Sequence, residues 1–168
     1  MTKRGRTKSA EKRRQILTAA IETFIERGFT GASMDEIAER AGVSKQTVYS
    51  HFRAKESLFK EAIEQKCEDF GLTEAFFAEA RAPRETLTEL ARHFLSLLLS
   101  PEPLAVMRLC IAEAQSHPEV AQLFFNTGPE HLTHMVSEYL QRLNESGQIH
   151  VAQPRFAAIQ FLHMVRGE

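Results

Sequence analysis

The sequence predicts an all-α protein, and three observations support that prediction. No stretch of its 168 residues alternates apolar and polar side chains with a period of two. No Asn-Gly or Asp-Gly pair is present to close a β-hairpin. Glycine and proline instead separate segments of helical length, in which apolar residues recur three and four positions apart. We therefore expect helices along the whole chain.

The first helix is expected to run from about Ser9 to Arg27. Ser9 can cap its start, and Gly28 is the residue type that commonly ends a helix. Between them, residues such as Ile16 and Phe24 form one continuous apolar stripe.

The next part of the chain has the pattern of two short helices joined by a tight turn. Ser33 with Glu36 three residues later forms a capping box, Gly42 supplies the turn, and Ser44 can cap the following helix. A longer amphipathic helix comes directly afterwards. The expected ranges are 33–41, 44–52 and 55–69.

The second half of the chain shows longer apolar helices, after a connection over 71–83 that is expected to be partly helical. Each expected helix has a proline at or just before its start, where a missing N–H costs little. Gly147 is expected to end the fourth of them. The expected ranges are 84–99, 103–116, 118–126, 130–145 and 154–166.

Composition excludes several classes of protein. No run of 18 apolar residues is present, so we expect no membrane partner, and the basic start is not followed by the apolar segment of a secretory signal. Cys67 and Cys110 are the only cysteines, and their separation suits neither a disulfide framework nor a zinc finger. We expect a cytoplasmic protein without a cofactor.

The net charge of −1 conceals two halves of opposite sign. Residues 1–66 carry a formal charge of +5, residues 67–168 carry −6, and no lysine follows Lys66. This division suggests a basic module for a polyanion joined to a module with another task. The alternative is a chance partition of solvated faces.

The helix expected at 44–52 has one face suited to DNA. At about 100° per residue, Val48 and Phe52 point inward together. The outward side chains are hydrogen-bonding groups of modest length, which suit base edges, phosphates and the thymine methyl. They are Gln46, Thr47, Tyr49 and Ser50, with Lys45 and His51 at the rim.

The charges around this helix support the same interpretation. From Arg40 to Lys55 no carboxylate occurs, and acids here would repel a phosphate backbone. Lys55 stands at the start of the next helix, where its ammonium and the first N–H groups can hold one phosphate. The basic segment from Lys3 to Arg14 can add contacts, unless it is only a solubilising tail.

These residues together resemble the DNA-binding domain of the tetracycline-repressor (TetR) family over about residues 10–70. The resemblance is carried by Ile16-Leu17-Thr18-Ala19-Ala20, Phe24, Gly28-Phe29, Ile37-Ala38, Ala41-Gly42-Val43-Ser44, Thr47-Val48-Tyr49, His51-Phe52 and Lys55-Glu56-Ser57-Leu58. It implies a helix-turn-helix over about 33–52 and a regulatory and dimerisation domain over 71–168. It also implies a transcriptional regulator that is usually a homodimeric repressor, released from palindromic operator DNA by a small effector.

The resemblance also assigns roles to individual residues. Thr47, Tyr49, His51 and Lys55 would contact DNA, and Ser33 would meet a phosphate. Lys45 and Gln46 occupy variable positions that help to set the operator sequence. Beyond residue 70 the likeness is limited to the helical layout and the stretch 108–114, and it names no ligand.

The second half offers candidates for a dimer interface and for an effector cavity. The last two expected helices would form the interface. Alternatively, the same residues would be core residues of the monomer. They are Leu132, Met135, Val136, Tyr139, Leu140, Leu143, Phe156, Ile159, Gln160, His163 and Met164. A cavity for a small apolar or amphipathic effector would lie among residues 84–126. Its candidate lining is His93, Phe94, Leu98, Met107, Arg108, Cys110, Ile111, Glu113 and Phe125.

Two alternatives stay open at this point. The chain can be a DNA-binding activator or an architectural protein without an effector. It can also be a helical-bundle metalloenzyme, because His131 and His134 are three positions apart on an expected helix. No nucleophile motif, phosphate loop or HExxH sequence supports an enzyme, so we expect neither catalysis nor a metal.

Overall fold

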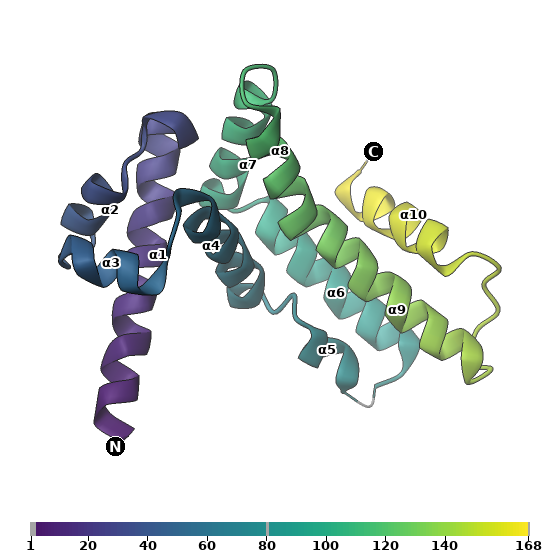
Figure 1. The fold of residues 1–168 in the computed structure, drawn as a ribbon. Helices are drawn as coiled ribbons and strands as arrows, with labels where there is room; N and C mark the ends of the chain where they lie inside the picture. The colour runs from purple at the N-terminus through teal and green to yellow at the C-terminus, as the bar shows by residue number, and fades with distance from the viewer. Residues whose placement is uncertain (1–2, 80, 168) are drawn as a thin grey trace. The chain divides into compact units, whose positions relative to one another are not determined.

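The structure, a computed structural model, describes residues 3–79 and 81–167, with side chains from Ser9 onward. About four fifths of the chain is helical, and the described residues contain no strand, which confirms the all-α prediction (Figure 1). The elements are α1 (Lys3–Gly31), α2 (Met34–Arg40), α3 (Lys45–His51), α4 (Lys55–Asp69), α5 (Glu74–Ala78), α6 (Pro83–Leu98), α7 (Pro101–Glu113), α8 (Pro118–Phe125), a π-helical turn (Asn126–Glu130), α9 (His131–Glu145) and α10 (Pro154–Arg166).

Several helix boundaries differ from the sequence expectation, and three of the differences have a clear physical reason. α1 begins at Lys3, so Ser9 lies inside it and caps nothing; the arginines, lysines and glutamate that follow favour helix. α7 begins at Pro101, since proline is tolerated in a first turn. Pro129 does not separate α8 from α9, because the chain continues through a π-helical turn whose wider spacing accommodates its ring.

The chain divides into two compact units. Unit 1 comprises Met1–Gln65 and Ala105–Phe124, and unit 2 comprises Lys66–Leu104 and Phe125–Glu168. Unit 1 therefore combines α1 to α3 and most of α4 with most of α7 and α8. The functional boundary expected near residue 70 stays a prediction.

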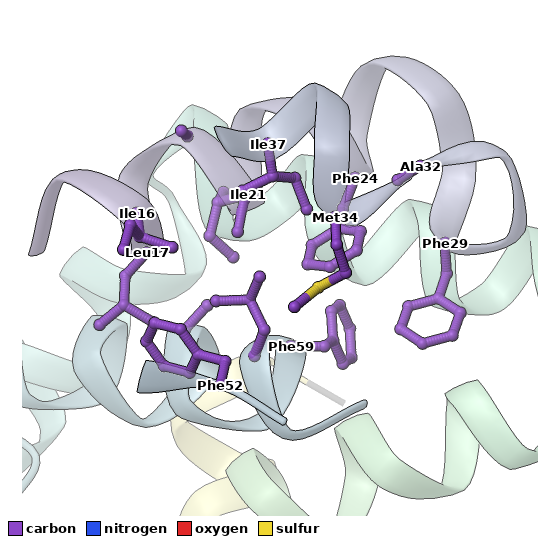
Figure 2. Close-up of a cluster of buried hydrophobic side chains, with 14 of the residues drawn as sticks. Ile16, Leu17, Ile21, Phe24, Phe29, Ala32, Met34, Ile37, Phe52 and Phe59 are labelled. Carbon is purple, nitrogen blue, oxygen red and sulfur yellow. The ribbon is translucent and has the colours of Figure 1, made fainter. Parts of the chain in front are cut away.

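The core of unit 1 is built around three phenylalanine rings. Phe24 stacks on Phe29 at 5.5 Å between ring centroids, and Phe59 of α4 meets both rings edge-on at 5.2 and 5.3 Å (Figure 2). Val106 and Cys110 of α7 are buried in the same core. The aromatic cluster thus ties α1 to α4, and α7 completes its cover.

Unit 2 is a helical bundle with α9 at its centre. Leu90 of α6, Val136 of α9 and Ala158 of α10 are fully buried in one cluster, and the rings of Phe76 and Phe77 from α5 add to it. α9 buries six side chains in this cluster, which are Leu132, Met135, Val136, Tyr139, Leu140 and Leu143. Gly147 closes α9 with a positive φ of 73°, as the sequence predicts.

The apolar helices are short by the standard of membrane spans. In the part of the chain that the structure describes, no single helix has both the length and the apolar composition to cross a bilayer. The pair α6 and α7 meets those two criteria only when taken together, across a bend.

Gly28 interrupts α1 with a backbone conformation that glycine alone adopts readily. Its φ of 77° and ψ of 164° are not helical, so the chain turns before Phe29. A Cβ at this position would lie 2.5 Å from Oε1 of Glu113, a carboxylate of α7. The backbone conformation therefore requires glycine here, and any larger residue would also displace the end of the Glu113 side chain.

Replacing Gly28 tests whether the turn requires glycine at this position. Gly28→Ala is expected to lower the free energy of unfolding by at least ~1–3 kcal/mol, the usual cost of such a backbone conformation in a residue with a Cβ. Thermal and urea denaturation followed by circular dichroism measure the change. Gly31→Ala is the matched control, because its added Cβ would be 3.6 Å from the nearest atom and is expected to be neutral or stabilising. Equal stability of the two variants would contradict the analysis.

Candidate nucleic-acid interface

α3 is fixed at both ends by local contacts. The Ser44 hydroxyl accepts a hydrogen bond from the Thr47 amide at 3.2 Å, and Gly42 turns the preceding chain with a φ of 66°. Val48 and Phe52 are buried in the core of unit 1, as the helical geometry predicts. The opposite face of α3 therefore points away from that core.

The outward face carries the expected side chains. Gln46 and Ser50 are exposed, and half of the Tyr49 surface is exposed, whereas Thr47 and His51 are half-buried. Three hydroxyls are held locally: those of Ser44 and Thr47 share a hydrogen bond of 2.8 Å, and that of Ser50 donates to the Thr47 carbonyl at 2.7 Å. Gln46 and Tyr49 are thus the longest polar groups on this face.

Two of the cations near α3 are already paired with carboxylates. The Lys45 ammonium donates to Asp35 of α2 at 2.5 Å, and this hydrogen bond raises the pKa of Lys45. The Arg40 guanidinium binds Glu26 of α1, whose hydrogen bond is the main cause of a raised Arg40 pKa. The acid-free stretch of sequence is therefore not an acid-free surface, because α1 and α2 bring carboxylates beside it.

Lys55 occupies the start of α4, but its ammonium is engaged by the preceding turn. Its Nζ donates to the carbonyl oxygens of Thr30, at 3.2 Å, and Ala32, at 2.9 Å, and lies 4.8 Å from the centre of the Phe29 ring. Ser33 caps α2 by accepting from the Glu36 amide at 3.1 Å. The Lys55 ammonium thus lies against the turn that leads to Ser33.

The basic residues at the start of the chain lie on α1. The side chains of Lys3, Arg4, Arg6 and Lys8 fall outside the described residues. Arg13 forms an ion pair with Glu61 of α4 and lies over the Phe52 ring, a role that the sequence did not reveal. Lys12 is exposed.

The residues expected to line an effector cavity are divided between the two units. His93, Phe94 and Leu98 of α6, and Phe125, belong to unit 2, while Met107, Arg108, Cys110, Ile111 and Glu113 of α7 belong to unit 1. Cys110 is buried, and that burial, with a smaller effect of Glu113, raises the pKa of its thiol to about 12. Glu113 accepts from the Phe29 amide, and the side chains of Ile111 and Phe125 are largely exposed. The cavity stays a prediction.

Unit 1 also carries an open groove on its surface. It has a volume of about 470 Å³ and lies between α1 and the end of α2, with Arg14, Glu22 and Arg40 among its lining residues. Mixed charges line it, which distinguishes it from the apolar cavity expected for an effector.

The histidines considered as metal ligands are surface residues. His131 and His134 are exposed, and the neighbouring Glu130 is paired with Arg155. Among the described residues, no group of three or more histidine, cysteine, aspartate or glutamate side chains is placed to hold a metal ion.

Two solved structures share this fold. A TetR-family transcriptional regulator from Mesorhizobium loti MAFF303099 is 34% identical, with a TM-score of 0.72, and the match covers 98% of this chain and 81% of that one. The flavonoid-responsive regulator FrrA is 33% identical, with a TM-score of 0.69, over 95% of this chain and 81% of that one.

Curated relatives give the same picture over shorter stretches. The activator FasR of Mycolicibacterium smegmatis is 49% identical over 55 residues, which are 33% of this chain and 25% of FasR. The regulator RutR of Escherichia coli K12 is 32% identical over 124 residues, which are 73% of this chain and 50% of RutR. The chain thus spans at most half the length of these two relatives.

Two family models match the chain itself. Residues 16–62 match the model of bacterial regulatory proteins of the tetR family, and residues 85–168 match the C-terminal domain of AefR-like transcriptional repressors. The second match alone covers half of the chain. The helix-turn-helix geometry of α2 and α3 agrees with the first match, which contains both helices. The chain belongs to the TetR family of DNA-binding transcriptional regulators.

Proposed function

We propose that this protein is a homodimeric repressor that binds a palindromic operator through α3 and leaves it when a small effector binds. The observation that carries the proposal is the orientation of α3, which buries Val48 and presents Gln46 and Tyr49 outward. Two such helices in a two-fold dimer suit half-sites ~34–36 Å apart, one turn of DNA. The proposal places the protein in the cytoplasm and includes no catalytic step.

The proposed DNA contacts divide into two groups. Side chains on the outward face of α3 would read base edges in the major groove, and those at helix starts and rims would meet phosphates. The first group is Gln46, Thr47, Tyr49 and Ser50. The second group is Ser33, Ser44, Lys45, His51 and Lys55. For Lys45, reaching a phosphate means exchanging Asp35 for DNA.

The proposed dimer interface involves α10 more than α9. The six α9 residues considered for it are buried in the core of unit 2 and present little surface. On α10, Phe156 and Met164 are 55% and 70% exposed, and Gln160 and His163 are exposed on the same side. Their spacing of three and four residues makes one stripe, the pattern of a helix that packs against a partner helix.

The effector is proposed to bind unit 2. The hydroxyl of Tyr139 and Nδ1 of His93 are buried there without a hydrogen-bond partner, a situation that costs ~1–3 kcal/mol for each group. Phe77 lies against Tyr139, and Phe76 lies against His93. An uncharged molecule with apolar rings and hydroxyl or carbonyl groups satisfies such a site, and FrrA is a flavonoid-responsive regulator.

A second candidate function is activation of transcription. FasR, with 49% identity over 55 residues, is an activator. The two functions use the same DNA contacts and differ in where the operator lies relative to a promoter. Selection of bound fragments from random DNA, followed by a transcription assay on the selected site, separates them. The proposal expects two inverted half-sites and reduced transcription. Recovery of no preferred sequence would overturn it.

Tyr49→Ala tests the face of α3 directly. The variant is expected to bind the selected operator ~1–3 kcal/mol more weakly, because a contact in the groove is lost while the helix keeps its buried anchor. Fluorescence anisotropy at fixed salt measures affinity, and circular dichroism confirms folding. Gln141→Ala, an exposed change on α9, is the control and is expected to bind as the unchanged protein does. Wild-type affinity of Tyr49→Ala would show that another face contacts DNA.

Asp35→Asn tests the exchange proposed for Lys45. Removing this carboxylate is expected to raise operator affinity a few-fold and to steepen the salt dependence by about one phosphate contact, since the Lys45 ammonium becomes available. Glu39→Gln removes one charge from the same helix, but Glu39 is not the partner of Lys45 in the structure. Identical effects of the two variants would mean that only net charge matters.

Tyr139→Phe tests the effector site. It removes the unpartnered hydroxyl and is expected to leave operator binding without effector unchanged, with equal or higher thermal stability. A panel of uncharged hydroxylated flavonoids is titrated into the protein–operator complex. Compounds that release the unchanged protein are expected to need at least about fivefold higher concentrations with the variant. Release of both proteins at equal concentrations would remove Tyr139 from the site.

A further inference from the structure

The carboxylate of Glu113, the last residue of α7, is bound to the turn that ends α1. Its Oε1 accepts a hydrogen bond from the Phe29 amide at 2.9 Å, across 84 positions of sequence. Both residues belong to unit 1. This contact is therefore internal to the body that holds α3.

The backbone at Gly28 creates the binding place for this carboxylate. Because Gly28 is not helical, the helical run of α1 is interrupted just before Phe29, and the Phe29 amide turns to a side chain. The missing Cβ of Gly28 leaves the space that Oε1 occupies. The Phe29 ring is meanwhile fixed by Phe24 and Phe59 (Figure 2). The carboxylate thus grips the backbone of a residue whose side chain is anchored in the core.

The same turn holds residues proposed to contact DNA. The carbonyls of Thr30 and Ala32 accept from the Lys55 ammonium, which also lies over the Phe29 ring. Ser33 follows directly and caps α2. Glu113 therefore holds the beginning of the turn, at Phe29. Lys55 binds the later part of the same turn, which leads directly to Ser33.

The contact is not the arrangement that stability alone favours. Oε2 of Glu113 is buried without a hydrogen-bond partner, so the carboxylate gives up water for one amide. Burial, and to a smaller extent the Glu113 charge, raises the pKa of the neighbouring Cys110 thiol to about 12. An uncharged side chain would avoid the desolvation of Oε2, whereas a carboxylate gives the stronger acceptor for the amide.

α7 is also the element through which this contact can respond to the rest of the chain. It begins at Pro101, among the residues that group with unit 2, and ends at Glu113 in unit 1. A displacement of α7 away from the turn would take this carboxylate with it.

We propose that Glu113 is a positioning residue for DNA binding: its carboxylate holds the 28–33 turn so that Lys55 and Ser33 face the phosphate backbone. Withdrawal of α7 releases the turn and weakens operator binding. This inference rests on the proposed DNA-binding function. The sequence suggested Glu113 as a candidate contact for the effector, whereas this inference gives it a role in supporting the DNA-binding residues of unit 1.

The sign of the expected effect separates this role from simple electrostatics. Removing a carboxylate ordinarily strengthens binding to DNA, or leaves it unchanged. We expect Glu113→Ala to bind the selected operator about tenfold more weakly, with a salt slope lower by about one phosphate contact. Glu113→Gln keeps an acceptor oxygen and is expected to stay within about threefold of the unchanged protein. Glu119→Ala, which removes an exposed carboxylate of α8 in the same unit, is the control.

A double-mutant cycle with Lys55→Ala tests whether Glu113 affects operator binding through Lys55. If Glu113 acts through Lys55, Glu113→Ala is expected to cost less than about twofold once Lys55 is absent. All affinities are measured well below the unfolding midpoint of each variant. An equal loss in both backgrounds, or a Glu113→Ala affinity equal to that of Glu119→Ala, would overturn the proposal.

Hydrogen exchange gives a readout that needs no DNA. The amides of residues 29–33 are expected to exchange at least about tenfold faster in Glu113→Ala than in Glu113→Gln, while the amides of α9 stay the same in both. Unchanged exchange in this turn would overturn the positioning role even if the operator is bound. If the amides of residues 29–33 exchange faster in Glu113→Ala, but the unchanged protein binds no operator, then the proposed DNA-binding function is wrong while the contact made by Glu113 is not.

Discussion

The arrangement of this regulator depends on the packing of three rings, Phe24, Phe29 and Phe59. They join the end of α1 to the middle of α4, and the buried side chains of α2 and α3 pack in the same core. Apolar burial on this scale outweighs the small contributions of the surface ion pairs nearby. The orientation of α3 is therefore a consequence of what its Val48 and Phe52 bury. The polar side chains on the opposite side of α3 form the face that we propose to contact DNA.

The same core explains why the turn after α1 carries so many polar contacts. With the Phe29 ring fixed, the backbone from Gly28 to Ser33 has little freedom, and its amides and carbonyls need partners. Glu113 and Lys55, of opposite charge, supply them from two helices that both come later in the chain, α7 and α4. Both ions are held mainly by backbone groups. The surface proposed to bind DNA is thus supported by charges whose partners are backbone groups and cannot rotate away.

Features that depend on neighbouring residues could be predicted from the sequence, whereas contacts between distant residues could not. The caps at Ser33 and Ser44 and the turns at Gly42 and Gly147 depend only on neighbouring residues, and each was expected. The inward direction of Val48 followed from helical periodicity. The pairs Lys45–Asp35 and Arg40–Glu26 join separate helices, so the absence of acids near α3 in the sequence was misleading. The grouping of most of α7 with unit 1, and of α6 with unit 2, depends on tertiary packing, which helical patterns do not reveal.

Unit 1 is discontinuous, because the first 65 residues share their core with residues 105–124. During synthesis the α1–α4 helices are made first, but Val106, Cys110 and Val120 reach their core only after some forty further residues have been added. Closing that intervening loop slows assembly more than it weakens the finished fold. Exchanging the C-terminal part of the chain at a junction near residue 70 would therefore divide the residues that form the core of unit 1. Chimeras are expected to be most stable when α7 and α8 come from the same parent protein as α1–α4.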